Sequence, residues 1–330
     1  MINDSLLVIV LAQAVLYGTP LLYAALGELL AERSGVLNLG VEGMMLFGAA
    51  VGYWVTQRFH GGNAAVLALA VLGAAVAGAA MAAIHAFLTI TMRANQIVSG
   101  LALTIFAGGL GLSAYFGNEL HLADKPPAHQ FGSIDVFGLK NVAVLGPVLA
   151  NQSALVYASW LLTALVALYL TRTRFGLNVR AVGEAPASAD AMGIGVTVYR
   201  YVHVLVGGAL AGIGGACYSL SITPGWVSGD TLVNGAGWIA IALVIFSFWR
   251  AEFCLAGAYL FGALSALPFA LQAKGTLERL PAGVLRAPEL YQALPYVLTV
   301  VVLVVISTSL AKRRLGAPAA LGVPYSREER

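Results

Sequence analysis

Long apolar segments recur along almost the whole chain and are separated by short stretches with charged or glycine-rich sequence. A run of about 20 apolar residues is long enough for a helix to cross the hydrocarbon core of a bilayer. Such runs lie near 6–26, 36–56, 64–92, 96–116, 153–171, 201–221, 236–249, 251–272 and 292–311. The pattern predicts an all-α fold, a polytopic transmembrane helical bundle of about 9–10 spans. The tenth would be a broken span near 27–35 or 222–235.

Composition supports a membrane protein. Of the 330 residues, 59% are hydrophobic and 10% are charged, with mean hydropathy +0.85, whereas soluble domains carry about 25% charged residues. We expect one membrane domain over 1–311 and a cytoplasmic tail at 312–330. The net charge of +3 is small and the basic residues lie at helix ends, so nucleic-acid binding is not indicated.

Positive charge predicts the orientation, because cytoplasmic loops are enriched in Lys and Arg. The 172–200 connection contains four arginines, and the tail starts with Lys312, Arg313 and Arg314. Both are expected in the cytoplasm, and the long 117–152 loop is expected outside. Nine spans place the N-terminus outside, and a tenth would reverse one end.

The stretch from Glu28 to Gly48 places charges, an asparagine and four glycines between two apolar runs. Polar groups at membrane depth must face protein or a water-filled path, and glycine-broken spans mark transport sites. This predicts a broken span near 34–43. Glu42 and Asn38 would share a helix face there. Glu42 either accepts hydrogen bonds from freed amides near Gly40 and Gly43 or lines the route.

The other residue types that could carry chemistry give no pattern of a catalytic or metal site. His85 and His203 stand singly in apolar spans, which does not indicate a metal site. Cys217 and Cys254 are expected to pack rather than to form a disulfide. No lysine follows glycine, so the phosphate-binding Gly-Lys-Ser/Thr loop is absent from the sequence, and no enzyme motif is evident.

The connection from Thr171 to Ile194 is too long for a tight turn. Pro186 followed by Asp190 is typical of a helix start, so a short helix is expected to lie across the cytoplasmic end. It would dock a cytoplasmic partner, and a solvated loop is the alternative.

Four stretches then carry a family resemblance: R-A-V-G-E-A-P-A-S-A-D-A-M-G-I at 180–194, E-R-S-G-V-L-N-L-G-V-E-G-M-M-L-F-G-A at 32–49, the segment from Gly237 to Arg250, and the tail A-P-A-A-L-G-V-P-Y. The first resembles the coupling loop of ABC importer permeases of the branched-chain amino acid, ribose and nucleoside type. The other three resemble the nucleoside branch served by basic-membrane-protein-like binding proteins. Ala185 and Val323 depart from the usual Asn and Lys.

The resemblance implies a type II ABC importer-like permease subunit for a nucleoside, most readily a purine, or a nucleobase. It implies a second, non-identical permease subunit, a separate cytoplasmic ATP-binding subunit and an extracytoplasmic substrate-binding protein that contacts the outer loop. It also implies a bacterial inner-membrane location, no enzymatic activity and no cofactor of its own, with ATP used by the partner. A sugar permease and an ion-coupled secondary transporter remain alternatives.

Two sets of residues follow as candidates. The ATPase-coupling set is Arg180, Ala181, Val182, Gly183, Glu184, Ala185 and Pro186. The substrate-pathway set is Asn38, Glu42, Asn95, Gln96, Ser99 and Trp226. For Asn95, Gln96 and Ser99 the alternative is an interfacial helix cap. For Trp226 it is membership of the aromatic belt, against stacking on a planar ligand.

Overall fold

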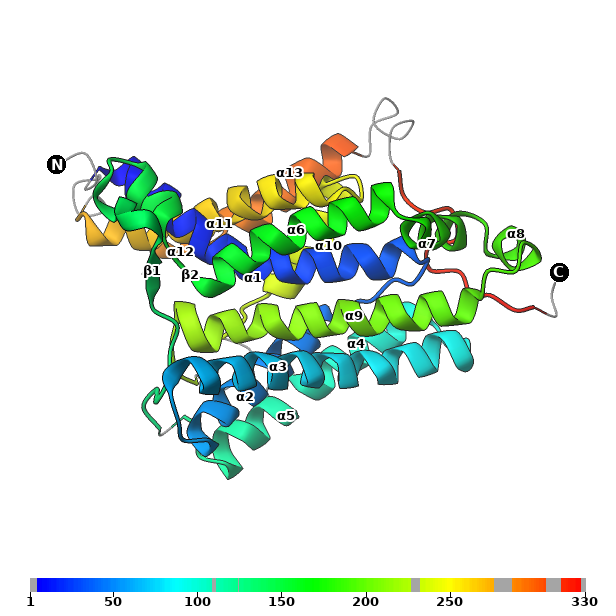
Figure 1. Ribbon diagram of the computed structural model, residues 1–330, viewed down its shortest axis with the longest axis horizontal. Coiled ribbons are helices and arrows are strands. Elements are labelled where there is room, and N and C mark those ends of the chain that lie inside the picture. Colours follow the sequence, from blue (N-terminus) through cyan, green and yellow to red (C-terminus); the bar gives the residue numbers. More distant parts are fainter. Residues whose placement is uncertain are drawn as a thin grey trace.

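The computed structural model describes residues 5–108, 111–123, 125–226, 232–275, 287–306 and 316–327. Its long helices run roughly along the longest axis of the molecule (Figure 1). The main ones are α1 (Leu6–Arg33), α2 (Val41–Arg58), α3 (Asn63–Ala86), α4 (Gln96–Ala107), α6 (Ala154–Arg172), α9 (Val196–Cys217), α10 (Ala236–Phe246), α11 (Ala251–Ala273) and α13 (Leu294–Ile306).

Each of the nine predicted spans overlaps one of these helices, which confirms the helical bundle. Among the described residues, five helices are long and apolar enough to cross a membrane. The span expected over 96–116 is interrupted, because α4 ends at Ala107 with Gly108 as its cap. Residues 27–33 belong to α1 and do not form a separate span. Residues 227–231 and 307–311, where parts of two predicted segments fall, lie outside the described residues.

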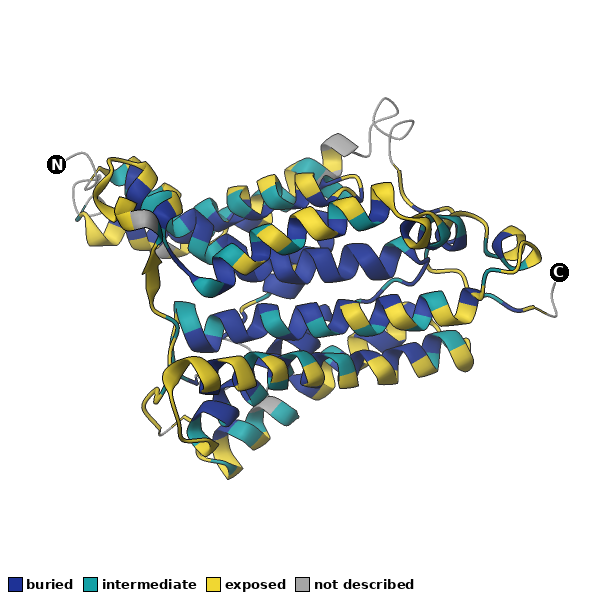
Figure 2. Cartoon of the chain, viewed as in Figure 1, coloured by how far each residue is buried: buried dark blue, intermediate teal, exposed yellow. Residues whose placement is uncertain are grey.

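Helix α9 packs against α1, α2 and α3. Its glycines permit this approach: a Cβ on Gly207 would lie 2.6 Å from the backbone oxygen of Gly27, and one on Gly212 would lie 2.2 Å from that of Ala74. Small residues at helix crossings are typical of membrane bundles. Both α1 and α9 are therefore buried along much of their length (Figure 2).

The outer helices turn large apolar side chains outward (Figure 2). A surface of this kind is expected where lipid or another membrane subunit replaces water. Examples on α3, α4, α6 and α13 are Leu69, Leu72, Val76, Ile105, Phe106, Leu161, Leu165, Leu168, Val300 and Val304.

The two ends of the bundle differ. One end carries the start of α1, α12 (Pro288–Gln292) and the 117–152 loop (Figure 1). Within that loop, β1 (Ser133–Asp135) and β2 (Asn151–Ser153) pair antiparallel with Ile134 opposite Gln152, a small exception to the all-α prediction. The loop also holds the π-helix η4 (Gly146–Ala150) and the 3-10 helix η3 (Val136–Asn141).

The opposite end carries α7 (Arg174–Glu184), α8 (Pro186–Ala191) and the tail (Figure 1). The helix start predicted at Pro186 is confirmed. A further helix, α7, fills 174–184, where the sequence analysis predicted no helix. The Thr173 hydroxyl caps α7 by accepting a hydrogen bond from the Gly176 amide at 3.0 Å.

Cysteine labelling will test which end is cytoplasmic. Ala128 is exposed in the outer loop, Met192 is 82% exposed after α8, and the native cysteines are buried. In intact spheroplasts of an expression host, a membrane-impermeant maleimide should label Ala128→Cys without permeabilisation. It should label Met192→Cys only after permeabilisation. The reverse pattern would invert the orientation.

Candidate functional site

The segment 34–40 between α1 and α2 is non-helical and mostly buried. The Asn38 amide N–H donates to Oε1 of Glu28 at 2.9 Å, and the Gly40 N–H donates to Oδ1 of Asn38 at 3.0 Å. The expectation that Asn38 and Glu42 share a helix face was therefore wrong, because α2 begins only at Val41. The Asn38 side chain instead closes a local turn.

Residues from α3 and α4 complete the bonding of this segment. Oε1 of Gln96 accepts the Leu37 N–H at 2.7 Å. The ring of His85, which is fully buried, lies between the Leu37 carbonyl oxygen (Nε2 to O, 3.1 Å) and the Ser99 hydroxyl (Nδ1 to Oγ, 3.0 Å). Gln96 and Ser99 are thus brought to the broken segment, together with a histidine that the sequence did not connect to it.

Glu42 binds the start of another helix. Its side chain is 5% exposed, and Oε1 and Oε2 accept the amides of Gly235 and Gly237 at 2.9 and 2.6 Å. A carboxylate at a helix N-terminus is favoured by the helix dipole and by charge-assisted hydrogen bonds. The expectation that Glu42 accepts hydrogen bonds from amides near Gly40 and Gly43 was wrong. The amides that it binds belong to the start of α10, 193 and 195 positions further along the chain than Glu42.

The remaining pathway candidates lie in different surroundings. Asn95 is exposed and caps α4, with Oδ1 accepting the Val98 N–H at 3.1 Å. Trp226 is 5% exposed and packs with Tyr53 and Leu122 in an apolar cluster. Its indole nitrogen is buried and has no hydrogen-bond partner among the described residues. Contact of any of the six candidates with substrate stays a prediction.

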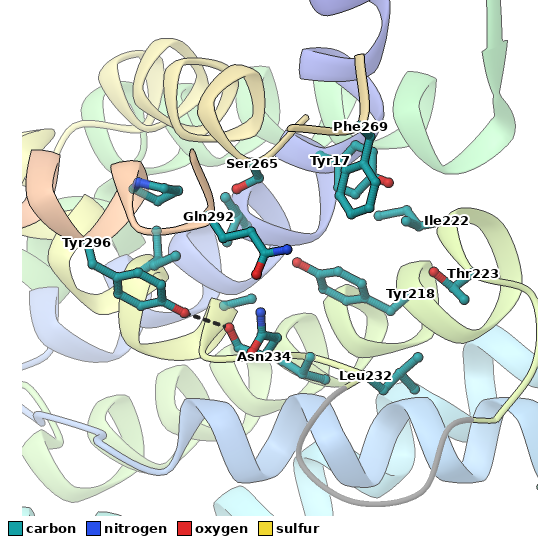
Figure 3. Close-up of a pocket in the computed structure, with 15 residues that line it drawn as sticks. Tyr17, Tyr218, Ile222, Thr223, Leu232, Asn234, Ser265, Phe269, Gln292 and Tyr296 are labelled. Atoms are coloured by element: carbon teal, nitrogen blue, oxygen red, sulfur yellow. Dashed lines mark hydrogen bonds between the residues drawn. The ribbon is translucent and has the colours of Figure 1, made fainter. Parts of the chain in front are cut away.

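A pocket of about 280 Å³ lies in the half of the bundle that carries α12, and none of the six pathway candidates lines it. Tyr17 of α1 and Phe269 of α11 stack at its wall, with ring centroids 5.7 Å apart and planes 12° apart. Tyr218 from the π-helix η5 (Tyr218–Ile222) projects into the pocket (Figure 3). Tyr296 of α13 lies across from it.

Polar groups converge on the same space. The hydroxyl of Tyr218 and the amide of Gln292 point toward one another across the pocket (Figure 3). The Tyr296 hydroxyl donates to the backbone oxygen of Asn234 at 2.9 Å. Asn234 directly precedes Gly235, which Glu42 holds. Glu42 therefore supports the pocket wall without lining it.

Backbone irregularities shape the pocket. Pro20 within α1 and Pro268 within α11 each remove a helical hydrogen bond close to the lining residues Leu21 and Phe269. The third irregularity is η5, and π-helical turns are frequent at functional sites. The two prolines within apolar spans were the signal that could have indicated this site from the sequence.

The coupling candidates form the joint between α7 and α8. Gly183 is buried against α1, since a Cβ there would lie 2.3 Å from the Arg33 backbone oxygen. Val182 is buried in a small apolar cluster with Ala189 and Val196. Ala185 (φ −146°, ψ 78°) breaks the helix before Pro186.

The outward side of this joint is open. Glu184 and Ala185 are exposed, and Ala181 is half-buried. Arg180 lines a cavity of about 270 Å³ together with Arg33 and Arg250. The structure therefore combines buried residues that fix the joint to the bundle with exposed residues that a partner could contact. In the described ranges, no group of three or more His, Cys, Asp or Glu side chains is placed to hold a metal ion.

The chain is a multi-pass helical bundle. It has a buried non-helical segment between α1 and α2, a pocket lined by polar and aromatic side chains, and a helical joint at one end. These features fit a membrane transport subunit. The family model for the branched-chain amino acid transport system permease component matches residues 10–303. The chain belongs to this family. It is a multi-pass permease subunit of the cytoplasmic membrane.

Relatives span nearly the full length. The "Putative glucose ABC transporter permease protein TsgC13" of Haloferax volcanii is 39% identical over 94% of this chain and 95% of its own. The nucleoside ABC transporter permease protein NupC of Lactococcus lactis is 33% identical over 96% of each chain. The guanosine ABC transporter permease protein NupQ of Bacillus subtilis is 34% identical over 98% of each. These relatives are permeases, not enzymes. No solved structure matches the chain.

Proposed function

We propose that this chain is one of two pore-forming subunits of an ATP-driven importer of nucleosides, with purine nucleosides as the preferred cargo. The pocket beside η5 carries the proposal. Aromatic rings offer flat apolar faces to a base, and the amide of Gln292 and hydroxyl of Tyr218 offer hydrogen bonds to ring nitrogens or ribose hydroxyls. The names of NupC and NupQ support the same substrate class.

Glucose is the second candidate, and TsgC13, at 39% identity, favours it. A sugar also packs on aromatic rings and bonds to amides, so the lining chemistry admits both. The volume of about 280 Å³ lies at the low end of ligand pockets, roughly 300–1,000 Å³. Uptake measurements separate the two substrates.

The partners follow from the family and from the two ends of the bundle. ABC permeases act with ATPases and binding proteins, and we propose that the ATPase docks on the joint at 180–186 and α8. Exposed Met192 beside that joint supports a protein contact there. The 117–152 loop at the other end would meet the binding protein, and a non-identical permease would complete the pore. In this arrangement 1–311 is the permease domain and 312–330 the cytoplasmic tail.

Uptake by the complete complex, expressed in a host without nucleoside or glucose uptake, tests the substrate. Labelled guanosine should accumulate and glucose should not, and uptake should stop on ATP depletion but survive a collapsed proton gradient. Gln292→Leu and Tyr218→Phe should each weaken apparent nucleoside affinity by roughly 5- to 150-fold, because a lost buried hydrogen bond costs about 1–3 kcal/mol. Glucose uptake alone would assign the sugar.

A matched control is available on α10. Trp238 is 38% exposed and does not line the pocket. Trp238→Phe should therefore leave apparent affinity unchanged. Nucleoside uptake with wild-type affinity in both pocket variants would place the substrate route elsewhere in the bundle.

A further inference from the structure

Residues 316–327, here called the strap, cross the end of the bundle beside α7 and α8 (the red trace in Figure 1). From its contacts we infer that the strap mechanically joins the α7–α8 joint to the broken segment 34–40. Its role is to couple ATP hydrolysis to transport. The inference rests on the proposed docking of an ATPase at the joint.

The strap is bonded to the joint through its backbone. The Ala320 N–H donates to the Gly183 carbonyl oxygen at 2.9 Å, and the Ala319 N–H donates to Oε2 of Glu184 at 3.2 Å. Both acceptors belong to the residues proposed to meet the ATPase. A shift of this joint must therefore move the strap or break these bonds.

The far end of the strap is bonded to α8. Arg327 forms an ion pair with Asp190, with Nε 3.0 Å from Oδ2. Tyr325 packs against the apolar cluster of Val182, Ala189 and Val196, which joins α7, α8 and the start of α9. The strap thus contacts both helices of the joint.

The same segment is bonded to the broken span. The Gly322 N–H donates to the carbonyl oxygen of Gly35 at 3.3 Å. Gly35 has φ +90°, and a Cβ there would lie 3.0 Å from Nη2 of Arg200 and 3.4 Å from the Ala320 oxygen. Gly35 lies within the segment whose later residues are bonded to Glu28 and Gln96. One short peptide therefore links the partner-facing joint to the broken segment 34–40.

The incomplete hydrogen bonding of Arg200 lowers the free-energy cost of releasing the strap. The Arg200 side chain is 2% exposed and donates through Nη1 to the Val323 oxygen at 3.2 Å. Its Nε and Nη2 are buried and have no hydrogen-bond partner among the described residues. A buried guanidinium without full pairing is unfavourable. Release of the strap would expose the Arg200 guanidinium to water. Its hydration would offset part of the free energy of the hydrogen bonds that the strap loses.

The test uses the complete complex in proteoliposomes, with ATP hydrolysis and solute import measured in the same samples. Two variants displace the strap: a stop codon at Gly316, and Ala320→Glu, which places a carboxylate where the native side chain is 8% exposed. The control is Val323→Ala, because that side chain is 52% exposed and the hydrogen bonds of Val323, to Ala320 and Arg200, are made by its backbone, which the substitution keeps.

Both strap variants should lower the solute imported per ATP hydrolysed by at least about tenfold while basal ATP hydrolysis continues, and the control should keep the wild-type ratio. A wild-type ratio in an assembled strap variant overturns the inference. Failure of both variants to assemble also overturns it, since the strap would then serve folding alone. The ratio is measured with whichever solute the wild-type complex imports, so a wrong substrate leaves this test intact.

Discussion

Replacing Gly183 by leucine is expected to lower transport by at least about tenfold, equivalent to about 1.4 kcal/mol of activation free energy. A Cβ at this position would lie 2.3 Å from the Arg33 backbone oxygen and 3.2 Å from Cβ of Pro318. A backbone atom cannot rotate away as a flexible side chain can. The end of α7 must therefore separate from α1, and the bond from Ala320 to the Gly183 oxygen is lost with it.

The measurement is substrate import and ATP hydrolysis by the purified, reconstituted complex, with its melting temperature as a folding control. Gly195→Leu is the matched control, because Gly195 is exposed and a Cβ there makes only ordinary contact with Val198 at 3.8 Å. We expect the control to transport normally. An assembled Gly183→Leu complex that imports at the wild-type rate would remove the joint from the coupling mechanism.

The spans could be predicted from the sequence because their signal is local. Membrane thickness sets a minimum length of apolar sequence, so runs such as 251–272 specify helices such as Ala251–Ala273 almost without tertiary information. The start of α8 was also predictable, since Pro186 restricts the backbone at a first helical turn.

Helix α7 was missed for a physical reason that the structure makes plain. Its arginines indicated only that the connection is cytoplasmic, while the buried residues Gly176, Val179, Val182 and Gly183 are spaced along one helix face. Two of these four are glycines, which carry no apolar signal. Such a short amphipathic face is stabilised by packing against α1 and α9, and the sequence does not show which surface it meets.

The polar site could be located only in part. Glu28–Gly48 marked the break correctly, but a carboxylate in a span does not reveal which distant amide it binds. His85 and Gln96 bond to Leu37, and Ser99 bonds to His85, only because α3 and α4 return to the break. The pocket residues Tyr17, Tyr218 and Gln292 come from three distant segments, and aromatic side chains in spans are more often packing residues.

Replacing Glu42 by glutamine is expected to destabilise the complex by about 1–3 kcal/mol. Both carboxylate oxygens accept backbone amides, from Gly235 and Gly237. Glutamine keeps one oxygen acceptor and turns an N–H₂ donor toward the other amide, so one buried N–H loses its partner. The charge that favours the α10 N-terminus is lost as well. The melting temperature of the purified complex should fall by several degrees.

Transport separates a supporting role from a direct one. Glu42 does not line the pocket. Those Glu42→Gln complexes that assemble should therefore keep the wild-type preference among nucleosides. Glu42→Asp is the companion variant: it keeps the charge but shortens the reach to Gly237, which the native Oε2 contacts at 2.6 Å. Aspartate should lower stability less than glutamine if charge dominates. A changed nucleoside preference with an unchanged melting temperature would instead place Glu42 on the route, in direct contact with the cargo.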